Sequence, residues 1–487
     1  MSGKKFPNGF LWGTAISAFQ VEMGRGEPSD KTDWWAWVHD KGIHEEGITS
    51  GDTPRDGPGF WELYDEDFRL IKDDLKCQSV RMSIDWGRLF PESTEDIEVD
   101  VTLDAHGNVV SVNIDETVIQ ALSDKAKRSS VKRYREILES AKERGLTVML
   151  TLFHWQIPLW LHDPIAVHKD IDSTDKRGWL DNRTLVEFSK LVAFIAHEYG
   201  DIVDLYNTIN EPRIISEHGY LSAHYEFPPG MYDAELFLKV MKNLAIAHGL
   251  AYEQVKKWDT QSYCDLGPCT VGLVPVLQVF TPYNADNPKD VEASKLIDYA
   301  FNEWGLNAVI HGDYDMNLDY VIQPEEQLPH LVKGCDFFGV NYYSRWHISH
   351  VDNGDVPLEN FKLMPCEGDC TDYGWEVYPE GIREVVNWAY KRYRRPIYIT
   401  ENGIADKEGD QRNRYLKVHI EKLHQAIVDD GVPVLGYYHW TMMDNFEWSD
   451  GYKIRFGLYQ VDIKTKKRSP TKTVKLYRAI TSSNSPV

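Results

Sequence analysis

Two short segments of the chain each end a β-branched, apolar run with a glutamate. Thr208-Ile209-Asn210-Glu211-Pro212 carries one glutamate, and Ile399-Thr400-Glu401-Asn402-Gly403 carries the other. Cleavage of a glycosidic bond needs two carboxyl groups, one protonated to donate to the leaving oxygen and one ionised to attack or stabilise the developing positive charge. A single glutamate at a strand end more often only caps the structure that follows, so it is the pairing that predicts glycoside chemistry.

Glu211 is the predicted general acid/base, and Glu401 is the predicted nucleophile. An acid needs an apolar or like-charged setting that raises its pKa, and a second carboxylate nearby supplies part of that setting. The nucleophile must stay ionised, and we expect Arg81 to provide a positive charge and Tyr343 a hydrogen bond. A carboxyl separation of about 5–5.5 Å gives retention of configuration and one of about 6.5–9.5 Å gives inversion, and the residues alone leave both outcomes open.

Apolar, β-branched runs alternate with amphipathic segments along the chain, which is typical of a parallel sheet with crossover helices. The predicted strands cover residues 10–17, 79–85, 147–153, 203–210, 270–277, 336–343, 396–401 and 434–441. The predicted helices cover residues 61–76, 132–144, 185–199, 236–257, 291–311, 380–392 and 413–430. We therefore predict an α/β fold, a single (β/α)8 TIM barrel spanning residues 1–487, with both glutamates on its carboxyl-terminal rim.

Other polar and aromatic residues fall at or just past the ends of the predicted strands. They are Gln20, His154, Trp155, Asn210, Asn341, Trp440, Glu447 and Trp448. Amide, imidazole and carboxylate groups bind sugar hydroxyls, and an indole face supports the apolar face of a pyranose. Each residue taken singly is more often a structural polar group or a core aromatic, so their shared place on the rim is what predicts a sugar site.

Two long insertions interrupt the alternation of strands and helices. Residues 92–130 are polar and acidic, and residues 109–114 within them predict a short hairpin or an extended edge strand. Residues 345–375 form the second insertion. Insertions on the rim shape substrate access, but a solvated excursion or a subunit contact is an equal alternative for the first insertion, which has no cluster of catalytic residue types.

The composition is that of a globular protein with a large core, with 42% hydrophobic and 26% charged residues among 487. The formal charge of −23 argues against a nucleic-acid partner, which requires a basic face, and against an anionic membrane surface. No apolar run approaches about 20 residues, and the start MSGKKFPNGF lacks the apolar centre of a secretory signal. We expect a cytoplasmic protein without nucleic-acid or membrane partners.

Six cysteines are scattered along the chain: Cys77, Cys264, Cys269, Cys335, Cys366 and Cys370. They are too sparse for a secreted disulfide scaffold, and free thiols are the favoured interpretation. The pairs Cys264/Cys269 and Cys366/Cys370 lie in loop-like stretches, so a small disulfide loop in each, or a shared metal site, stays an alternative. Neither spacing is the two-residue gap of zinc knuckles, and we expect neither a metal nor a cofactor.

At these residues the chain resembles glycoside hydrolase family one, the retaining β-glycosidases. The family signatures read Asn-Glu-Pro around the acid/base and Thr-Glu-Asn-Gly around the nucleophile, and Glu211 and Glu401 match those positions. The similarity covers nearly the whole chain, from residues 10–14 through His154-Trp155 and Asn341-Tyr342-Tyr343 to residues 444–448. Residues 32–40, 158–164 and 227–230 resemble the archaeal, thermophile-type members.

The resemblance implies a barrel enzyme that cleaves β-galactosides and β-glucosides with retention of configuration. It implies that the glycone is bound by Gln20, His154, Asn210, Glu447 and Trp448, with Trp440 beneath it and Arg81 and Tyr343 beside the nucleophile. The substrate would be a small oligosaccharide or an aryl or alkyl β-glycoside. The archaeal relatives are typically homotetramers, so we expect a homo-oligomer, either a tetramer or a dimer.

Glu447 also bears on the substrate subtype. Family members that hydrolyse 6-phosphoglycosides have a smaller residue there, and a glutamate repels phosphate. Lys453 and Arg455 follow, but ordinary glycosidases of the family carry basic residues in this segment too, so a phosphate site is disfavoured. Gln156, where proline is common, and residues 441–443 depart from the archaeal pattern, which bears on the ranking of substrates and leaves the reaction class unchanged.

The leading hypothesis is a retaining exo-β-glycosidase for β-D-galactosides and β-D-glucosides, with β-fucosides and β-mannosides as further candidates. A non-catalytic carbohydrate-binding barrel is one alternative, and it predicts the loss of one carboxylate, whereas both are present. An enzyme that mainly transfers the sugar to another acceptor is the other alternative. The preferred glycone depends on the exact placement of Gln20, Glu447 and Trp448, which the sequence does not give.

Overall fold

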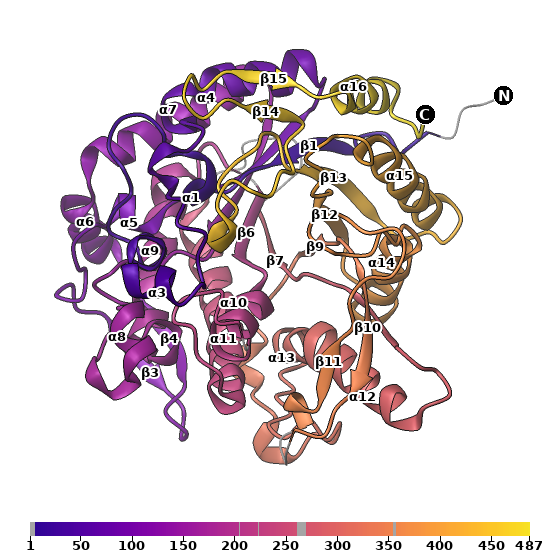
Figure 1. Ribbon diagram of the computed structural model, residues 1–487. Helices are drawn as coiled ribbons and strands as arrows, with labels where there is room; N and C mark the ends of the chain where they lie inside the picture. Colours follow the sequence, from indigo (N-terminus) through magenta and orange to yellow (C-terminus); the bar gives the residue numbers. More distant parts are fainter. Residues whose placement is uncertain (1–4, 204, 223, 261–268, 354–356) are drawn as a thin grey trace.

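A computed structural model of the chain describes residues 5–203, 205–222, 224–260, 269–353 and 357–487. Eight strands close into a barrel in the order β1-β13-β12-β9-β7-β6-β5-β2, with parallel neighbours throughout (Figure 1). They are β1 (Leu11–Ala15), β2 (Ser79–Ser83), β5 (Thr147–Phe153), β6 (Leu205–Asn210), β7 (Thr270–Val274), β9 (Phe337–Asn341), β12 (Ile397–Asn402) and β13 (Val434–Trp440). The predicted (β/α)8 barrel is confirmed.

Helices surround the barrel (Figure 1). The longer ones are α4 (Phe60–Arg69), α7 (Arg128–Glu143), α9 (Asn182–Tyr199), α11 (Ala234–Trp258), α12 (Pro288–Asp298), α13 (Trp304–His311), α14 (Glu380–Tyr393), α15 (Arg412–Val428) and α16 (Thr473–Ser483). The other α-helices are α1 (Ala18–Val21), α2 (Asp33–His39), α3 (Lys41–Glu45), α5 (Trp86–Leu89), α6 (Glu116–Lys125), α8 (Pro164–Lys169) and α10 (Pro212–Tyr220). Short 3₁₀ turns include η4 (Gly178–Leu180) and η9 (Trp448–Asp450).

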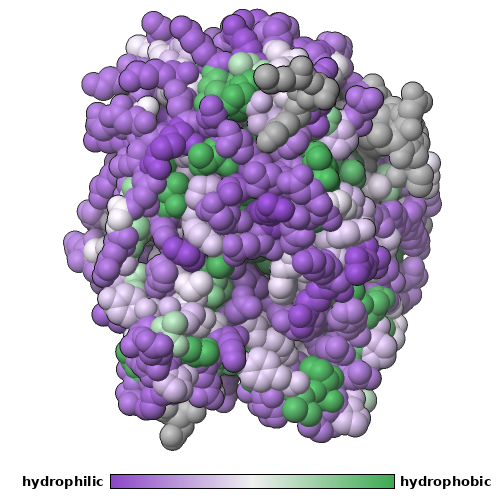
Figure 2. All heavy atoms as spheres, turned by 90° about the vertical axis from the view of Figure 1, so that its right-hand side faces the viewer, coloured by the Kyte–Doolittle hydropathy of each residue, from purple (hydrophilic) through white to green (hydrophobic). Residues whose placement is uncertain are grey.

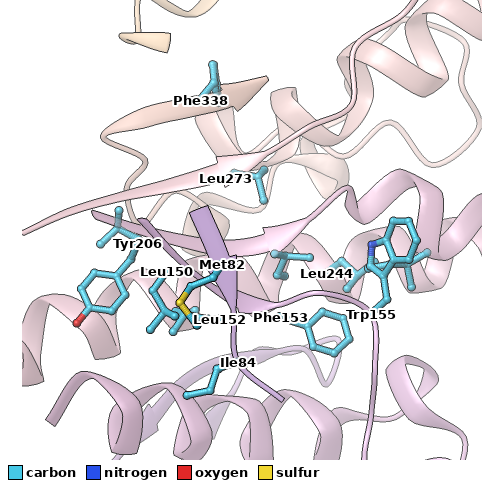
Figure 3. Close-up of a cluster of buried hydrophobic side chains, with 14 of the residues drawn as sticks. Met82, Ile84, Leu150, Leu152, Phe153, Trp155, Tyr206, Leu244, Leu273 and Phe338 are labelled. Atoms are coloured by element: carbon cyan, nitrogen blue, oxygen red, sulfur yellow. The ribbon is translucent and has the colours of Figure 1, made fainter. Parts of the chain in front are cut away.

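Successive residues of each barrel strand face opposite layers of the core, as the period of two in a strand requires. One buried cluster contains Ala15, Met149, Leu205, Phe337, Tyr398 and Tyr438, contributed by six of the barrel strands. A second cluster contains the alternate residues Met82, Leu150 and Leu152 together with side chains from the surrounding helices (Figure 3). Arg81 is flanked by residues of the second cluster, so its side chain faces the barrel interior.

Two predicted helices are broken in the structure. Residues 61–76 form α4 followed by a π-helical turn, η2 (Leu70–Asp74), and residues 291–311 form α12, a second π turn, η5 (Tyr299–Glu303), and α13. A π turn is a short segment of i→i+5 hydrogen bonds within an otherwise α-helical stretch, and a prediction of helix does not distinguish the two kinds of turn. The C-terminal helix α16, which buries Val474, Tyr477 and Ile480, was not among the predicted helices.

Both insertions form small antiparallel or mixed sheets. In the first, β3 (Asp100–Leu103) pairs with β4 (Val109–Asn113), which confirms the predicted hairpin. In the second, β10 (Arg345–His350) lies between β11 (Phe361–Leu363) and β8 (Val279–Pro282). β8 was not predicted, and it attaches the second insertion to the segment that follows β7. Near the C-terminus, β14 (Tyr459–Val461) pairs with β15 (Arg468–Pro470).

The expectation of free thiols is wrong for Cys366 and Cys370. These residues form a disulfide with a Cα–Cα distance of 6.1 Å, because the chain turns back between them and brings them within the span of such a bond. Cys77 and Cys335 are buried free thiols. Cys264 lies outside the described residues, so the structure does not test the pair Cys264/Cys269.

The face of the molecule shown in Figure 2 is mostly hydrophilic, and its hydrophobic side chains lie in small, separate groups. This agrees with the high content of acidic residues, 76 Asp and Glu against 53 Lys and Arg. Within the described ranges, no helix has the length and apolar character that a membrane crossing requires.

A buried ion pair attaches the C-terminal hairpin to the first long helix. Arg468 of β15 donates from Nε and Nη2 to the two carboxylate oxygens of Asp67 in α4, at 2.7 Å each, and from Nη1 to the carbonyl of Pro58 at 2.9 Å. Both side chains are at most 1% exposed. Arg468 Nη2 also contacts the sulfur of Met443, so the pair supports the loop that follows β13.

We expect Asp67→Asn to lower the free energy of unfolding by about 3–5 kcal/mol, because it leaves the buried guanidinium of Arg468 without its counter-charge. Glu136→Gln, which breaks the exposed pair of Lys132 and Glu136, should lower it by less than about 1 kcal/mol. Urea titration followed by fluorescence measures both. Equal, small effects in the two variants would contradict a structural role for the buried pair.

Candidate active site

The two predicted catalytic glutamates lie at the same end of the barrel. Glu211 follows β6 directly and precedes the first residue of α10, and its backbone N–H donates to Val274 at the end of β7. Glu401 lies in β12, where it pairs with Asn341 of β9. Both side chains are buried, with Glu211 6% and Glu401 3% exposed. Their shared location on the rim agrees with the placement expected from the sequence.

Glu401 is surrounded by donors of positive or polar character. Arg81 of β2 forms an ion pair with Glu401 Oε1 through Nη1. The hydroxyl of Tyr343 donates to the other carboxylate oxygen at 2.6 Å. Each oxygen therefore has one strong hydrogen bond, and a guanidinium at contact distance favours the ionised form of a carboxyl group.

Glu211 has the opposite surroundings. Burial, and then the negative charge of Glu401, raise the pKa of Glu211 from 4.5 to about 8, against the hydrogen bond from Asn341 and the more distant charges of Arg213 and Arg81. Asn341 Nδ2 donates to Glu211 Oε1 at 2.8 Å. Glu211 is therefore protonated at neutral pH, while the neighbouring carboxyl group of Glu401 is paired with Arg81.

One hydrogen-bonded network connects the two carboxyl groups. Arg81 Nη2 donates to Asn210 Oδ1 at 2.6 Å, and the same oxygen accepts from Asn341 Nδ2 at 3.2 Å. Arg81 therefore contacts Glu401 and Asn210, and Asn341 contacts Asn210 and Glu211. Because these side chains are 0–1% exposed, a change at one carboxyl group is transmitted to the other through fixed partners rather than through water.

His154 offers a hydrogen-bond donor to the site. Since Asn210 Oδ1 accepts twice, its Nδ2 is the donor to His154 Nε2, at 3.2 Å. Burial and the charge of Arg81 hold the pKa of His154 well below 6.5, so the ring is neutral. An accepting Nε2 places the proton on Nδ1, which is buried and has no partner among the described residues.

Gln20 and Glu447 form a second polar group. Gln20 Nε2 lies 3.2 Å from Glu447 Oε2 and 3.1 Å from Asn445 Oδ1, and its Oε1 accepts from Ser17. Burial, and then the charges of Asp450 and Glu401, raise the pKa of Glu447 well above 4.5. Glu447 is half-buried, whereas Gln20 is 1% exposed, so the amide lies deeper in the protein than the carboxyl group that it contacts.

The three predicted tryptophans flank these polar groups. The rings of Trp440 and Trp448 each stack nearly parallel to the imidazole of His154, with centroids 6.1 Å apart. The ring of Trp448 also packs on Trp155 at 4.6 Å. The indole N–H of Trp155 donates to the carbonyl of Asn210 at 2.9 Å, so this residue fixes the main chain beside Glu211 instead of offering its N–H to a ligand.

Three of the site residues have backbone conformations in the left-handed region. The φ angles are +45° at Glu211, +87° at Trp155 and +48° at Trp448. Non-glycine residues adopt such conformations only where their surroundings hold them, and they concentrate at functional sites. Here they occur at points where the chain has just left a strand or begins a turn.

The sequence analysis missed several residues of the site. Thr151 accepts from Arg81 Nε at 3.1 Å, and the hydroxyl of Thr400 donates to Asn341 Oδ1 at 2.7 Å. They lie two residues after Met149 and Tyr398, which face the barrel interior, but they are out of phase with His154 and Glu401, so the period of two does not connect them with the predicted site residues. Trp375, whose ring lies 5.3 Å from that of Tyr343, and Tyr373, which bonds Asp450, lie in the second insertion and have no such signal either.

The arrangement combines a buried carboxyl group with a raised pKa, a second carboxyl group that is ion-paired with an arginine, and surrounding amide, imidazole and indole groups. These are the components of acid-assisted displacement at an anomeric carbon. The family described as glycosyl hydrolase family 1 matches residues 2–104 and 120–486. The chain belongs to glycosyl hydrolase family 1.

Relatives of this family 1 hydrolase include proteins of archaea and of hyperthermophiles. The β-galactosidase of Pyrococcus woesei is 36% identical over 502 residues, which are 98% of this chain and 97% of that protein. The crystal structure of the β-glycosidase from the hyperthermophile Thermosphaera aggregans has a TM-score of 0.89 at 33% identity, covering 99% and 98% of the two chains. A β-glucosidase mutant derived from a hyperthermophilic tetrameric structure has a TM-score of 0.86 at 35% identity, covering 99% and 96%.

These findings confirm the resemblance inferred from the sequence, and the protein is a glycoside hydrolase. Membership of this family also rules out the alternative that the chain is a carbohydrate-binding barrel without catalytic activity.

The charge of Glu401 is one cause of the raised pKa of Glu211, so its removal has a defined sign. We expect Glu401→Gln to lower the pKa of Glu211 from about 8 toward neutrality, as followed by NMR titration of 13C-labelled glutamate carboxyl groups. Glu253→Gln, which removes a charge from a surface pair with Lys333, is the control and should leave that pKa unchanged. An unshifted titration in Glu401→Gln would mean that burial alone accounts for the raised value.

Proposed function

We propose that this family 1 enzyme is a retaining exo-β-glycosidase that acts on β-D-galactosides and β-D-glucosides through a glycosyl-enzyme intermediate. The observation that carries the proposal is the contrast between the two glutamates. Glu401 is ion-paired with Arg81, whereas Glu211 is buried with a raised pKa. A double displacement requires this division of roles between its nucleophile and its acid.

In the first step, a carboxylate oxygen of Glu401 attacks the anomeric carbon and the bond to the leaving oxygen breaks. The proton of Glu211 passes to that oxygen, so the aglycone departs as a neutral alcohol. Tyr343 and Arg81 hold Glu401 in place through separate oxygens, which leaves its orientation fixed as the carboxylate becomes an ester.

In the second step, Glu211 acts as the base. Once Glu401 is esterified its charge is gone, and the pKa of Glu211 falls because that charge was one of the causes of its elevation. The Glu211 carboxylate takes a proton from water as the water oxygen bonds to the anomeric carbon, and Glu401 leaves as a carboxylate. Two inversions give the sugar its original configuration.

The remaining rim residues form the proposed glycone site. His154 Nδ1 supplies a donor without a protein partner in the described ranges, and Glu447 and Gln20 supply a carboxyl and an amide group at its other side. Trp440 and Trp448 provide apolar faces. Asn210 and Asn341 contribute through the network that holds Arg81 and Glu211. A site closed by buried groups on this side favours removal of one terminal sugar.

The substrate proposal rests on the relatives and on Glu447. One relative is a β-galactosidase and another is a β-glucosidase mutant, which supports both sugars as glycones. The neighbouring negative charges that raise the pKa of Glu447 would also act against a phosphate group beside it, which disfavours a 6-phosphorylated glycone. β-Fucosides and β-mannosides differ from these sugars at single hydroxyl positions and are proposed as further substrates. Some transfer to acceptors other than water follows, since any hydroxyl that reaches the intermediate competes with water.

We further propose that the barrel and its insertions form one catalytic domain, that the chain assembles as a homo-oligomer, a tetramer or a dimer, and that it works in the cytoplasm. The tetrameric origin of one related β-glucosidase supports the assembly. The charge of −23 supports the absence of nucleic-acid partners.

The central test is hydrolysis of p-nitrophenyl β-glycosides, with the released sugar followed by NMR. We expect rapid release from the galactoside and glucoside, weaker release from the fucoside and mannoside, and none from the 6-phosphogalactoside. The β-anomer should appear first and mutarotate later. Initial release of the α-anomer would overturn the retaining mechanism, and rapid cleavage of the phosphorylated substrate would overturn the role of Glu447.

We expect Glu401→Gly to lower kcat for an aryl β-glycoside by at least about a thousandfold, because no group remains to form the intermediate. Azide should restore turnover by entering the vacated space, and it should give the α-glycosyl azide since it attacks from the side of the missing carboxylate.

Glu211→Ala is the matched control for this experiment. There the intermediate still forms with an activated aryl substrate, so azide attacks it from the opposite side and should give the β-glycosyl azide. The same azide anomer from both variants, or no rescue of Glu401→Gly, would contradict the assigned roles.

A further inference from the structure

A buried hydrogen-bond cluster lies behind Glu401, on the side away from the glycone residues. Asn402, the next residue along β12, donates from Nδ2 to the carbonyl of Tyr342 at 2.7 Å and to the hydroxyl of Tyr415 at 3.0 Å. The hydroxyl of Tyr415 in turn donates to the carbonyl of Tyr343 at 3.1 Å. Tyr415 and Asn402 are fully buried, so these bonds do not compete with water.

The cluster joins the two residues that set the geometry of the nucleophile. Asn402 is covalently adjacent to Glu401, and Tyr343 carries the hydroxyl that donates to Glu401 Oε2. A single hydroxyl, that of Tyr415, accepts from the first and donates to the main chain of the second. Tyr415 therefore bridges β12 and the residue that carries the Glu401 hydrogen bond, independently of the bonds of the barrel itself.

The position of Tyr415 is itself tightly held. Its ring packs with Val377 and Ile404, and it stacks on His419 at 3.8 Å. The first turn of α15 is held by Asp406, whose Oδ2 accepts from the backbone N–H groups of residues 411 and 412 at 2.9 and 2.8 Å. These contacts fix the hydroxyl of Tyr415 relative to β12 before any substrate binds.

A neighbouring tyrosine fixes the other partner. The hydroxyl of Tyr437 in β13 donates to Asn402 Oδ1 at 2.9 Å. Since Oδ1 is occupied, Nδ2 of Asn402 must face Tyr415 and the carbonyl of Tyr342. Each hydrogen bond of the bridge through Tyr415 thus has a defined donor and acceptor.

We propose that Tyr415 is a positioning residue for the glycosyl-transfer step, which sets the distance between the Tyr343 hydroxyl and the Glu401 carboxylate. This inference rests on the proposed role of Glu401 as the nucleophile. Tyr415 touches no substrate, and it acts through Tyr343. If Tyr415 acts only through Tyr343, the loss of the Tyr415 hydroxyl should have little effect once the Tyr343 hydroxyl has been removed. This dependence makes the proposal testable.

The test is a double-mutant cycle on kcat/KM for an aryl β-galactoside. Tyr415→Phe keeps the ring on Val377 and Ile404 and removes only the bridging hydroxyl. We expect kcat/KM to fall about tenfold in the native background and less than about twofold in the Tyr343→Phe background, where the hydroxyl that Tyr415 positions is already absent.

The matched control is Tyr199→Phe. The hydroxyl of Tyr199 in α9 is also buried and also donates to a main-chain carbonyl, that of Val131 at 3.0 Å, but it lies outside the site. We expect it to lower the melting temperature as much as Tyr415→Phe does while leaving kcat/KM unchanged. Equal losses of activity in Tyr415→Phe and Tyr199→Phe would overturn the proposal.

Activity of the unmodified protein is measured first. An inactive, folded protein would overturn the proposed function, whereas an active protein in which the Tyr415→Phe loss is the same in both backgrounds would overturn only the role of Tyr415. If Tyr415→Phe does not fold, Asn402→Ser removes the same bridge from its other end. The same dependence on Tyr343 is then expected, and additive losses would again overturn the proposal.

Discussion

The guanidinium of Arg81 is the group on which the site depends. It is 1% exposed, and each of its three nitrogens has a partner: Nε with Thr151, Nη1 with Glu401 and Nη2 with Asn210. A buried cation is tolerated only when such partners replace its water. Arg81 forms its ion pair with Glu401, whereas burial and then the charge of Glu401 raise the pKa of Glu211, so that Glu211 holds a proton.

This distribution of charge requires closure of the barrel. The partners of Arg81 come from β5, β6 and β12, strands that are far apart in sequence and meet around one guanidinium only when the eight strands close. The outward residues of the same strands, such as Met82 and Leu150, pack against helices and fix the strands in register. A slip of one residue in β2 would exchange Arg81 with an apolar neighbour and remove the cation from the site.

The sequence predicted the site residues whose positions are determined by the barrel strands. Glu211, Glu401 and Arg81 could be placed because each lies in or directly after a strong apolar run. Trp375 and Tyr415 could not be placed, because their positions depend on the path of an insertion and on how α15 docks against the barrel. The π turn η5 was missed for a different reason, since a helical pattern does not distinguish i→i+4 from i→i+5 hydrogen bonds.

The residues around the two carboxyl groups and several residues of the proposed glycone site differ in the same way, since the first lie on or directly after strands and the second in a short helix or a turn. The groups around the two carboxyls come from barrel strands or the residues that directly follow them, whereas Gln20 lies in the short helix α1, and Asn445, Glu447 and Trp448 lie in the turn after β13. Loops and turns vary in path more readily than paired strands. In the proposed site, changes in the turn after β13 would therefore alter which hydroxyls are bound while the network of Arg81, Asn210 and Asn341 stays intact, so the proposal assigns reaction class and sugar preference to different parts of the chain.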